Sequence, residues 1–360
     1  MKPVDTAIAW PFTEESDWIN SAKGDSNHLL YARNTPAPIV TELEQRIANM
    51  EGADYGLAFS SGMAAIFATL MTLLKPGAKI VALDALYGGT FSLLHHVFPT
   101  WGVDCQLVRT PSELFKEIEQ GCDIVYLETP SNPMLVEVDI AATSALAKKS
   151  NALLICDNTV ATPFTQNPIK HGADIVVHSA TKFLGGHMDA LAGVVCCSAK
   201  HRDLIHQHRE LIGSVLAPQA AQLISRGLES FELRMSRATD NAAHLAAWLN
   251  NHPNVTQVFH PSINEPTKRS TLRRSVALLS FELKNRAAVS HFLKRCDSLT
   301  LASTLGATHT LIGLPETTSH VECTVEERKA LGIPEGLVRV SVGIERIEQL
   351  LARFDHALEF

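Results

Sequence analysis

The sequence predicts an α/β protein in which a large, mainly parallel sheet domain is followed by a smaller C-terminal α+β domain. Two observations carry this prediction. Short apolar segments alternate with helical segments over residues 57–197, a pattern typical of parallel strands joined by helical crossovers. From residue 199 onward the pattern becomes helical, and further strands follow only near the C-terminus.

The length of 360 residues allows two domains and an arm. We expect residues 1–40 to form an N-terminal arm without a packed element, because Pro3, Pro11, Pro36 and Pro38 stand there among polar residues. Residues 41–230 are expected to form the large domain and residues 231–360 the small one. The boundary is placed at Phe231, where a long connecting helix over 231–251 is predicted to begin.

Individual elements follow from hydrophobic period and from Gly, Pro and small polar residues at their ends. In the large domain we predict strands at 57–59, 79–83, 103–108, 123–127, 152–156, 175–177 and 192–197, with helices at 41–51, 61–74, 112–120 and 140–149. In the small domain we predict strands at 276–283 and 337–342, with helices at 287–295 and 345–358.

Composition excludes several classes of partner. The net charge of −7 argues against nucleic acid as the main partner, and the basic cluster Lys268, Arg269, Arg273 and Arg274 is interpreted as a solvated loop. We expect no membrane segment, since no apolar run has the length of a span, and no signal peptide. The seven cysteines contain no Cys-x-x-Cys pair, which favours a reducing compartment and a cytoplasmic location.

A lysine at the end of a predicted buried strand is the strongest functional signal. The strand is followed by Ser179, Thr181 and Lys182, and then by Gly185 and Gly186. Burial lowers the pKa of a lysine, so its amine can act as a nucleophile or Schiff-base former. The hydroxyls can bind a phosphate, and the glycines let a flat ligand approach the backbone. The alternative for Lys182 is a surface lysine on a loop.

Three more positions carry polar groups that need a binding partner. Asp157 ends an apolar run, so it needs a cationic partner unless it only caps a helix or forms an Asx turn. A helix that starts at Ser61 and Gly62 offers N–H groups to an anion, although Ser61 could be an ordinary N-cap. Arg339 stands in the middle of an apolar strand, where an unpaired guanidinium would be costly, so it needs a partner, which could be a structural salt bridge.

The run Ser179-Ala180-Thr181-Lys182-Phe183-Leu184-Gly185-Gly186-His187 resembles the lysine motif of the Cys/Met-metabolism family of pyridoxal-phosphate (PLP) enzymes. Further motifs occur in the family's order over roughly residues 31–345: Tyr31-Ala32-Arg33, Ser61-Gly62-Met63, Tyr87-Gly88-Gly89-Thr90, residues 303–311 and residues 336–345. The resemblance implies the PLP-dependent transferase-like fold, fold type I, of aspartate aminotransferase. A nicotinamide dehydrogenase is a weak alternative, because the sequence contains no Gly-x-Gly-x-x-Gly motif. A non-enzymatic scaffold is also weak, because the full set of expected PLP residues is present.

The resemblance implies roles residue by residue. Lys182 and Tyr87 are expected to be catalytic, with PLP attached to Lys182 and the Tyr87 ring stacked on it. The expected cofactor-binding residues are Tyr31, Arg33, Ser61, Gly62, Met63, Tyr87, Asp157, Ser179, Thr181 and Lys182. The expected substrate-binding residues are Asn132, Thr304 and Arg339, and no metal ligand is expected.

Tyr31 and Arg33 are expected to reach the cofactor phosphate of a neighbouring subunit. The resemblance therefore implies a homodimer or homotetramer with shared active sites.

The implied activity is elimination from a sulfur amino acid by a carbon–sulfur lyase of the cystathionine β/γ-lyase type. The alternative is γ-replacement by a cystathionine γ-synthase or O-acyl-homoserine sulfhydrylase. Gly89 disfavours the methionine γ-lyases, which usually have cysteine there. His309 stands at the family's common glutamate and cannot attract an ammonium group in the same way, which disfavours γ-specificity and cystathionine as the substrate.

Overall fold

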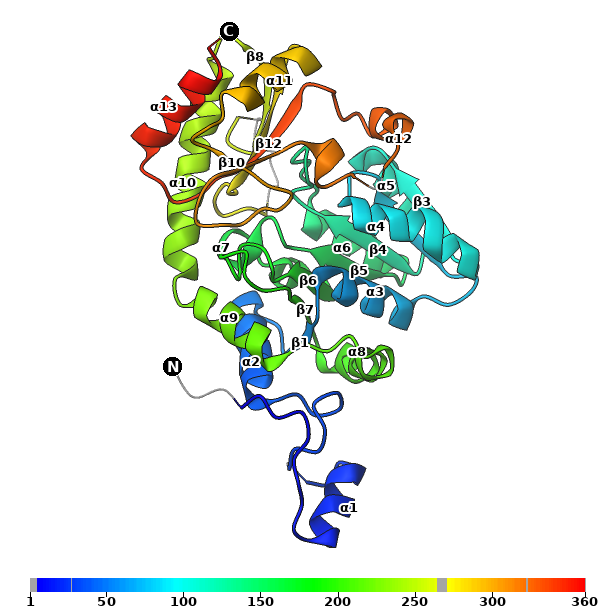
Figure 1. The fold of residues 1–360 in the computed structure, drawn as a ribbon. Coiled ribbons are helices and arrows are strands. Elements are labelled where there is room, and N and C mark those ends of the chain that lie inside the picture. Colours follow the sequence, from blue (N-terminus) through cyan, green and yellow to red (C-terminus); the bar gives the residue numbers. More distant parts are fainter. Residues whose placement is uncertain (1–4, 27, 264–270, 322, 360) are drawn as a thin grey trace.

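The computed structural model describes residues 5–26, 28–263, 271–321 and 323–359. Figure 1 shows a large sheet with helices on both faces, a smaller sheet beside the C-terminus, and an N-terminal arm that projects from the body.

The large sheet has seven strands in the order β1-β7-β6-β5-β4-β2-β3. Strands β6, β5, β4, β2 and β3 are parallel, whereas β7 runs antiparallel to both β6 and β1. The strands are β1 (Tyr55–Phe59), β2 (Lys79–Leu83), β3 (Asp104–Val108), β4 (Ile124–Glu128), β5 (Leu153–Asp157), β6 (Ile175–Ser179) and β7 (Gly193–Cys197). The predicted mainly parallel sheet is therefore confirmed.

Alternate residues of each strand enter hydrophobic clusters on opposite faces of this sheet. In β4, Val125 and Leu127 belong to one cluster, and Ile124 and Tyr126 belong to the other. This is the expected consequence of the two-residue period of a strand. The helices around the sheet are α2 (Pro38–Glu51), α3 (Gly62–Leu73), α4 (Gly88–Ser92), η1 (Leu93–Val97), η2 (Phe98–Trp101), α5 (Pro111–Glu119), α6 (Ile140–Lys149), α7 (Thr162–Thr165), η3 (Pro168–His171), α8 (Ala199–Ile212) and α9 (Pro218–Leu228).

The second sheet has five strands in the order β10-β11-β12-β9-β8. Helix α10 (Phe231–Asn250) runs along one side of the molecule toward it, as Figure 1 shows. The elements that follow α10 in the chain are β8 (Val255–Phe259), β9 (Leu278–Leu283), α11 (Arg286–Lys294), β10 (Thr300–Leu301), β11 (Leu311–Gly313), η4 (Pro315–Thr317), α12 (Val325–Ala330), β12 (Leu337–Ser341) and α13 (Ile347–Ala357). Helix α10 begins at Phe231 as predicted, while the domain boundary itself stays a prediction.

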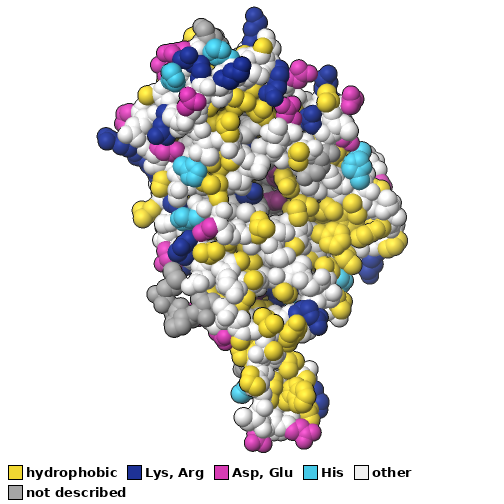
Figure 2. Space-filling model, viewed as in Figure 1, with side chains coloured by type: hydrophobic (Ala, Val, Ile, Leu, Met, Phe, Trp, Pro, Cys, Tyr) yellow, Lys and Arg dark blue, Asp and Glu magenta, His cyan; other side chains and the backbone are white. Residues whose placement is uncertain are grey.

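The arm contains a helix that we did not predict, α1 (Glu15–Lys23). It fits between Pro11 and Pro36, with acidic residues in its first turn and Gly24 as a left-handed C-cap, so the prolines do not interrupt it. The arm still projects from the body, and hydrophobic side chains gather on its surface (Figure 2). Among them, Ile8 is 61% and Trp18 is 58% exposed.

The basic cluster lies only partly within the described residues, because Lys268 and Arg269 fall outside them. Arg273 donates hydrogen bonds to Asn167 Oδ1 at 2.8 Å and to the Pro163 carbonyl at 2.7 Å. This arginine therefore binds the large domain as well as facing solvent. In the part of the chain that the structure describes, no helix combines the length and apolarity that crossing a membrane requires.

A buried ion pair joins α2 to α8 behind the first strand. Arg209 is 1% exposed, and its Nη1 lies 2.6 Å from Glu44 Oε1. Glu44 Oε1 also accepts a hydrogen bond from the Ala58 N–H at 2.7 Å, and Arg209 donates to the Ala58 carbonyl at 2.9 Å. The Glu44 carboxylate thus neutralises the buried Arg209 charge and also binds the backbone of β1 at Ala58.

We expect Glu44→Ala to lower the free energy of unfolding by about 3–5 kcal/mol, because it leaves the Arg209 charge buried without its partner. Urea unfolding followed by circular dichroism measures this. The matched control is Gln45→Ala on the exposed face of the same helix, for which we expect a change within about 0.5 kcal/mol. Equal effects of the two variants would contradict the assigned role of the pair.

Candidate active site

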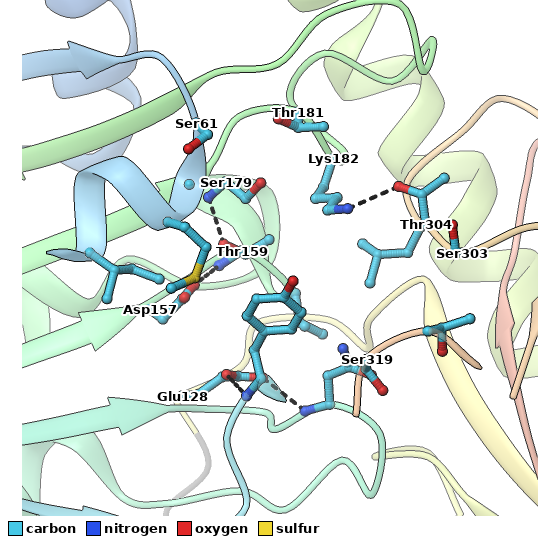
Figure 3. Close-up of a pocket in the computed structure, with 18 of the residues that line it drawn as sticks. Ser61, Glu128, Asp157, Thr159, Ser179, Thr181, Lys182, Ser303, Thr304 and Ser319 are labelled. Atoms are coloured by element: carbon cyan, nitrogen blue, oxygen red, sulfur yellow. Dashed lines mark hydrogen bonds between the residues drawn. The ribbon is translucent and has the colours of Figure 1, made fainter. Parts of the chain in front are cut away.

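A cavity of about 870 Å³, part of it open to solvent, lies between the carboxyl ends of the parallel strands and the C-terminal part of the chain (Figure 3). Position at the carboxyl ends of parallel strands is the common location of ligand sites in such folds. The residues that line it and were predicted as site residues are Ser61, Gly62, Met63, Tyr87, Asn132, Asp157, Ser179, Thr181, Lys182, Thr304 and Arg339.

Lys182 follows β6 and extends into this cavity (Figure 3). Its Nζ donates a hydrogen bond to Thr304 Oγ1 at 2.9 Å, which links the large sheet to the C-terminal part of the chain. Burial, and then the positive charge of Arg339, lower the pKa of Lys182 from 10.5 to about 8. A large fraction of this amine is therefore neutral near pH 8, as a nucleophile or base requires.

Beta strand β6 ends two residues later than predicted, at Ser179, because its pairing with β7 continues to the Ser179–Gly193 pair. The Ser179 N–H donates to Thr159 Oγ1 at 2.8 Å, and the Thr159 N–H donates to Asp157 Oδ1 at 2.9 Å (Figure 3). The ends of β5 and β6 are thus connected directly. This connection holds the segment before Lys182 beside Asp157.

The start of α3 forms the end of the cavity that suits a phosphate. Ser61 caps this helix, and its Oγ accepts a hydrogen bond from the Ala64 N–H at 3.0 Å. A Cβ on Gly62 would lie 2.7 Å from Ser179 Cβ, so only glycine lets the two segments approach this closely. Backbone N–H groups at the start of a helix, with hydroxyls nearby, form a typical anion site.

Two carboxylates lie side by side at the strand ends. Glu128 pairs with Asp157 in the register of β4 and β5, and both are buried. Burial raises the pKa of Asp157, and burial together with the Asp157 charge raises the pKa of Glu128 to about 8. Glu128 accepts hydrogen bonds from the N–H groups of Tyr87 at 2.7 Å and Asn132 at 3.0 Å. Asp157 therefore faces the cavity as a carboxylate whose ionised form needs a cation.

Arg339 is a buried cation without a carboxylate partner among the described residues. Its Nη2 donates to the Thr304 carbonyl at 2.9 Å, its Nη1 lies 3.5 Å from Asn132 Oδ1, and its Nε has no partner. Burial lowers the pKa of Arg339 to about 10. The structural salt bridge considered as the alternative is absent from the described part of the chain, so a ligand carboxylate suits this position.

Tyr87 precedes α4 and lines the cavity. A Cβ on Gly89 would lie 2.7 Å from Tyr87 Cε1 and 2.8 Å from Met63 Sδ. A side chain at position 89 would therefore force Tyr87 or Met63 to move.

Two predicted cofactor residues lie outside the cavity of their own chain. Tyr31 is 42% exposed in the arm, with the Arg33 guanidinium 5.9 Å from its ring centroid, and Arg33 Nη1 donates to the Glu210 carbonyl at 3.1 Å. The predicted role of both residues toward a neighbouring subunit stays a prediction. His309 is partly exposed and does not line the cavity either.

Other residues that line the cavity were not predicted as site residues. Glu128 is the last residue of β4 and Thr159 comes two residues after β5, and this signal, a polar residue after an apolar run, was available in the sequence. Ser303, Thr318 and Ser319 come from irregular segments of the C-terminal part, where no hydrophobic period marks them. They are brought to the cavity by the folding of that part over the sheet edge.

Comparison with known proteins agrees with this geometry. The model of the Cys/Met metabolism PLP-dependent enzyme family matches residues 1–359. A protein named L-methionine gamma-lyase from Fusobacterium nucleatum subsp. nucleatum is 42% identical over 332 residues, which cover 89% of this chain and 84% of that protein. A protein named cystathionine beta-lyase from Lactococcus lactis subsp. cremoris is 38% identical over 360 residues, covering 98% and 94%.

Among solved structures, cystathionine gamma synthase from Xanthomonas oryzae pv. oryzae, in complex with aminoacrylate and cysteine, superposes with a TM-score of 0.92. It is 31% identical and covers 99% of this chain and 92% of that chain. The predicted fold type I is confirmed by this similarity and by the sheet order. With a family match over residues 1–359 and a lysine cavity at the expected sheet edge, this chain belongs to the Cys/Met metabolism PLP-dependent enzymes.

Proposed function

We propose that this protein is a carbon–sulfur lyase that eliminates a sulfur substituent from an amino acid of the cystathionine type. The observation that carries the proposal is a partly buried amine, Lys182, that is hydrogen-bonded to the Thr304 hydroxyl and lowered in pKa by Arg339, a buried cation with no carboxylate partner among the described residues. The names of the lyase relatives from Fusobacterium and Lactococcus support the same reaction class.

The cavity residues fit pyridoxal phosphate. Asp157 offers a carboxylate to the ring nitrogen, and the start of α3 with Ser61, Ser179 and Thr181 offers donors to the phosphate. The close approach of Gly62 to Ser179 leaves backbone N–H groups, including that of Met63, as the phosphate-binding surface. When bound, this cofactor supplies an electron sink that stabilises negative charge on the substrate Cα.

The remaining residues bind the substrate and move protons. Arg339 and Asn132 hold the α-carboxylate, with Thr304 at the same edge of the cavity. The neutral Lys182 amine accepts the Cα proton, and its hydrogen bond to Thr304 Oγ1 orients it. Tyr87, held by its N–H bond to Glu128, assists proton transfer at the sulfur leaving group.

The second candidate is γ-replacement, in which a thiol joins a homoserine ester. The TM-score of 0.92 to a cystathionine gamma synthase favours keeping this alternative. The reactions differ in whether a thiol or water enters after the leaving group departs. A residue larger than glycine at position 89 would displace Tyr87 or Met63. The choice between a cystathionine-type substrate and methionine stays a prediction from the resemblance.

The domain division proposed here is an N-terminal arm over residues 1–40, a PLP-binding domain over 41–230 and a small C-terminal domain over 231–360. Lys182 and Asp157 fall in residues 41–230 and Arg339 in residues 231–360.

We also propose a cytoplasmic location, since no disulfide joins the described cysteines. A fraction of the native protein recovered from another compartment would contradict that location.

We propose a homodimer or a homotetramer in which Arg33 and Tyr31 of one chain complete the phosphate site of another. Their distance from the cavity of their own chain and the exposed apolar side chains of the arm support this arrangement. Mixing Arg33→Ala with Lys182→Ala, followed by partial unfolding and refolding, should restore part of the activity that each variant lacks alone. If Arg33 acted within its own chain, mixing would restore nothing.

The rate at which Lys182 of the apoprotein reacts with formaldehyde and cyanoborohydride should rise with pH and reach half its plateau near pH 8. The pKa of this amine is lowered to about 8, so the reactive neutral form is already abundant there. Peptide mass spectrometry measures the rate. Arg339→Gln removes the second cause of the shift and should move the midpoint upward, whereas exposed Arg226→Gln should not. An unmoved midpoint in Arg339→Gln would contradict the assigned electrostatics.

Incubation of the PLP-loaded enzyme with L-cystathionine should release a keto acid, which chromatography identifies. Pyruvate indicates β-elimination and 2-oxobutyrate indicates γ-elimination. Lys182→Ala should abolish release, and exposed Lys200→Ala should leave it unchanged. If no keto acid forms, but a homoserine ester and a thiol are joined, γ-replacement is the function.

A further inference from the structure

We propose that His95, His96 and Glu327 form a binding site for a divalent transition-metal ion such as Zn²⁺, outside the cavity described above. The three residues come from η1 and α12, which are far apart in the sequence. In Figure 2 histidine side chains gather on the surface beside the helix that α4 and η1 form, below α12 in the view of Figure 1. No motif spacing in the sequence indicated this site.

The spacing of the three ligand atoms suits one ion. His95 Nδ1 lies 3.5 Å from His96 Nε2 and 3.9 Å from Glu327 Oε1, and His96 Nε2 lies 3.7 Å from the same oxygen. The point equidistant from three atoms at these separations is about 2.1 Å from each, which is the length of Zn–N and Zn–O bonds. The two separations to the carboxylate exceed those of direct hydrogen bonds.

The convergence of two adjacent histidines is itself unusual. Side chains at i and i+1 of a helix do not face each other. Here His95 and His96 lie in a π-helical turn, and their rings meet edge to face at a centroid distance of 4.6 Å and an angle of 78°. Single π-helical turns occur frequently at functional sites, and this one brings two imidazoles to the same carboxylate oxygen.

Neighbouring contacts orient two of the three ligands. Glu327 Oε2 accepts the Thr324 N–H at 2.6 Å, so the capping box of α12 holds the carboxylate and leaves Oε1 toward the histidines. The His95 ring stacks on Phe91 at 5.1 Å with an angle of 21° between the planes. Such outer contacts are a regular feature of metal sites, because they orient the ligands before the ion binds.

The ligand types select the class of metal. Two imidazoles and one carboxylate suit Zn²⁺ and its neighbours in the first transition row, whereas Mg²⁺ and Ca²⁺ prefer oxygen ligands alone. Because His95 and His96 are exposed, water can complete the coordination. We therefore expect an exchangeable ion rather than one that the fold requires.

The ion would connect two segments that already meet beside the substrate cavity. Gly88, the first residue of α4, donates its N–H to the Ser319 carbonyl at 2.8 Å, and both Tyr87 and Ser319 line the cavity. Helix α4 leads directly into η1, and Ser319 precedes α12 in the chain. A metal bridge between η1 and α12 would thus hold the two sides of this contact together.

The test uses untagged, PLP-loaded, chelator-treated enzyme and Zn²⁺ alone, with binding followed by isothermal titration calorimetry at pH 7.5. We expect His96→Gln and Glu327→Gln each to weaken this site by at least about tenfold, because loss of even an outer-shell partner of a metal ligand typically weakens binding by about 10–100-fold. Glutamine at position 327 can keep the capping contact. The matched control is exposed His244→Gln on α10, for which we expect wild-type binding.

Thermal unfolding gives an independent readout, because an ion that binds only the folded state raises the Tm. Zn²⁺ should raise the Tm of the wild type and of His244→Gln but not that of His96→Gln. Zn²⁺ binding that is unchanged in His96→Gln and Glu327→Gln would place the ion elsewhere, for example on cysteines or on the cofactor. That result, or no binding at micromolar Zn²⁺, would overturn the proposal.

Discussion

The site depends on the burial of four ionisable groups that are not paired with one another. Lys182 and Arg339 are the basic groups of the cavity, and Glu128 and Asp157 are the acidic ones. Burial disfavours the charged form of each, so the pKa of Lys182 is lowered to about 8 and that of Glu128 is raised to about 8. Within the described part of the chain, no ion pair joins the two sets. An unpaired charge is costly to bury, so a ligand that carries both signs of charge would stabilise the ionised forms of these groups. A pyridine ring, a phosphate and an amino acid carry those charges.

The parallel sheet is what brings these groups together. Strands β4, β5 and β6 end at the same edge, so Glu128, Asp157 and the segment before Lys182 become neighbours although they are distant in the sequence. Hydrogen bonds through Thr159 then connect β5 to β6. The chemistry of the site is a consequence of strand direction, because antiparallel neighbours would place these ends on opposite edges.

The C-terminal part of the chain closes the cavity from the other side. Thr304 and Arg339 meet Lys182 there, and Ser319 contacts the first residue of α4. Glu327, His95 and His96 lie farther along the same contact between η1 and α12. The substrate cavity and the proposed metal site thus lie along one contact, in which α4 and η1 meet the segment from Ser319 to α12.

The sequence alone determined the α/β architecture, because alternating apolar and amphipathic segments have few other solutions. It also identified Lys182, Asp157 and Arg339, whose polar groups stand at the ends or in the middle of apolar runs. Helix α1 and the pocket residues Thr318 and Ser319 were missed, since short or irregular segments carry no hydrophobic period. The unpaired state of Arg339, the lowered pKa of Lys182 and the meeting of His95, His96 and Glu327 were decided by the tertiary structure alone. Each depends on burial or on a distance between residues remote in the chain, and a linear sequence contains neither quantity.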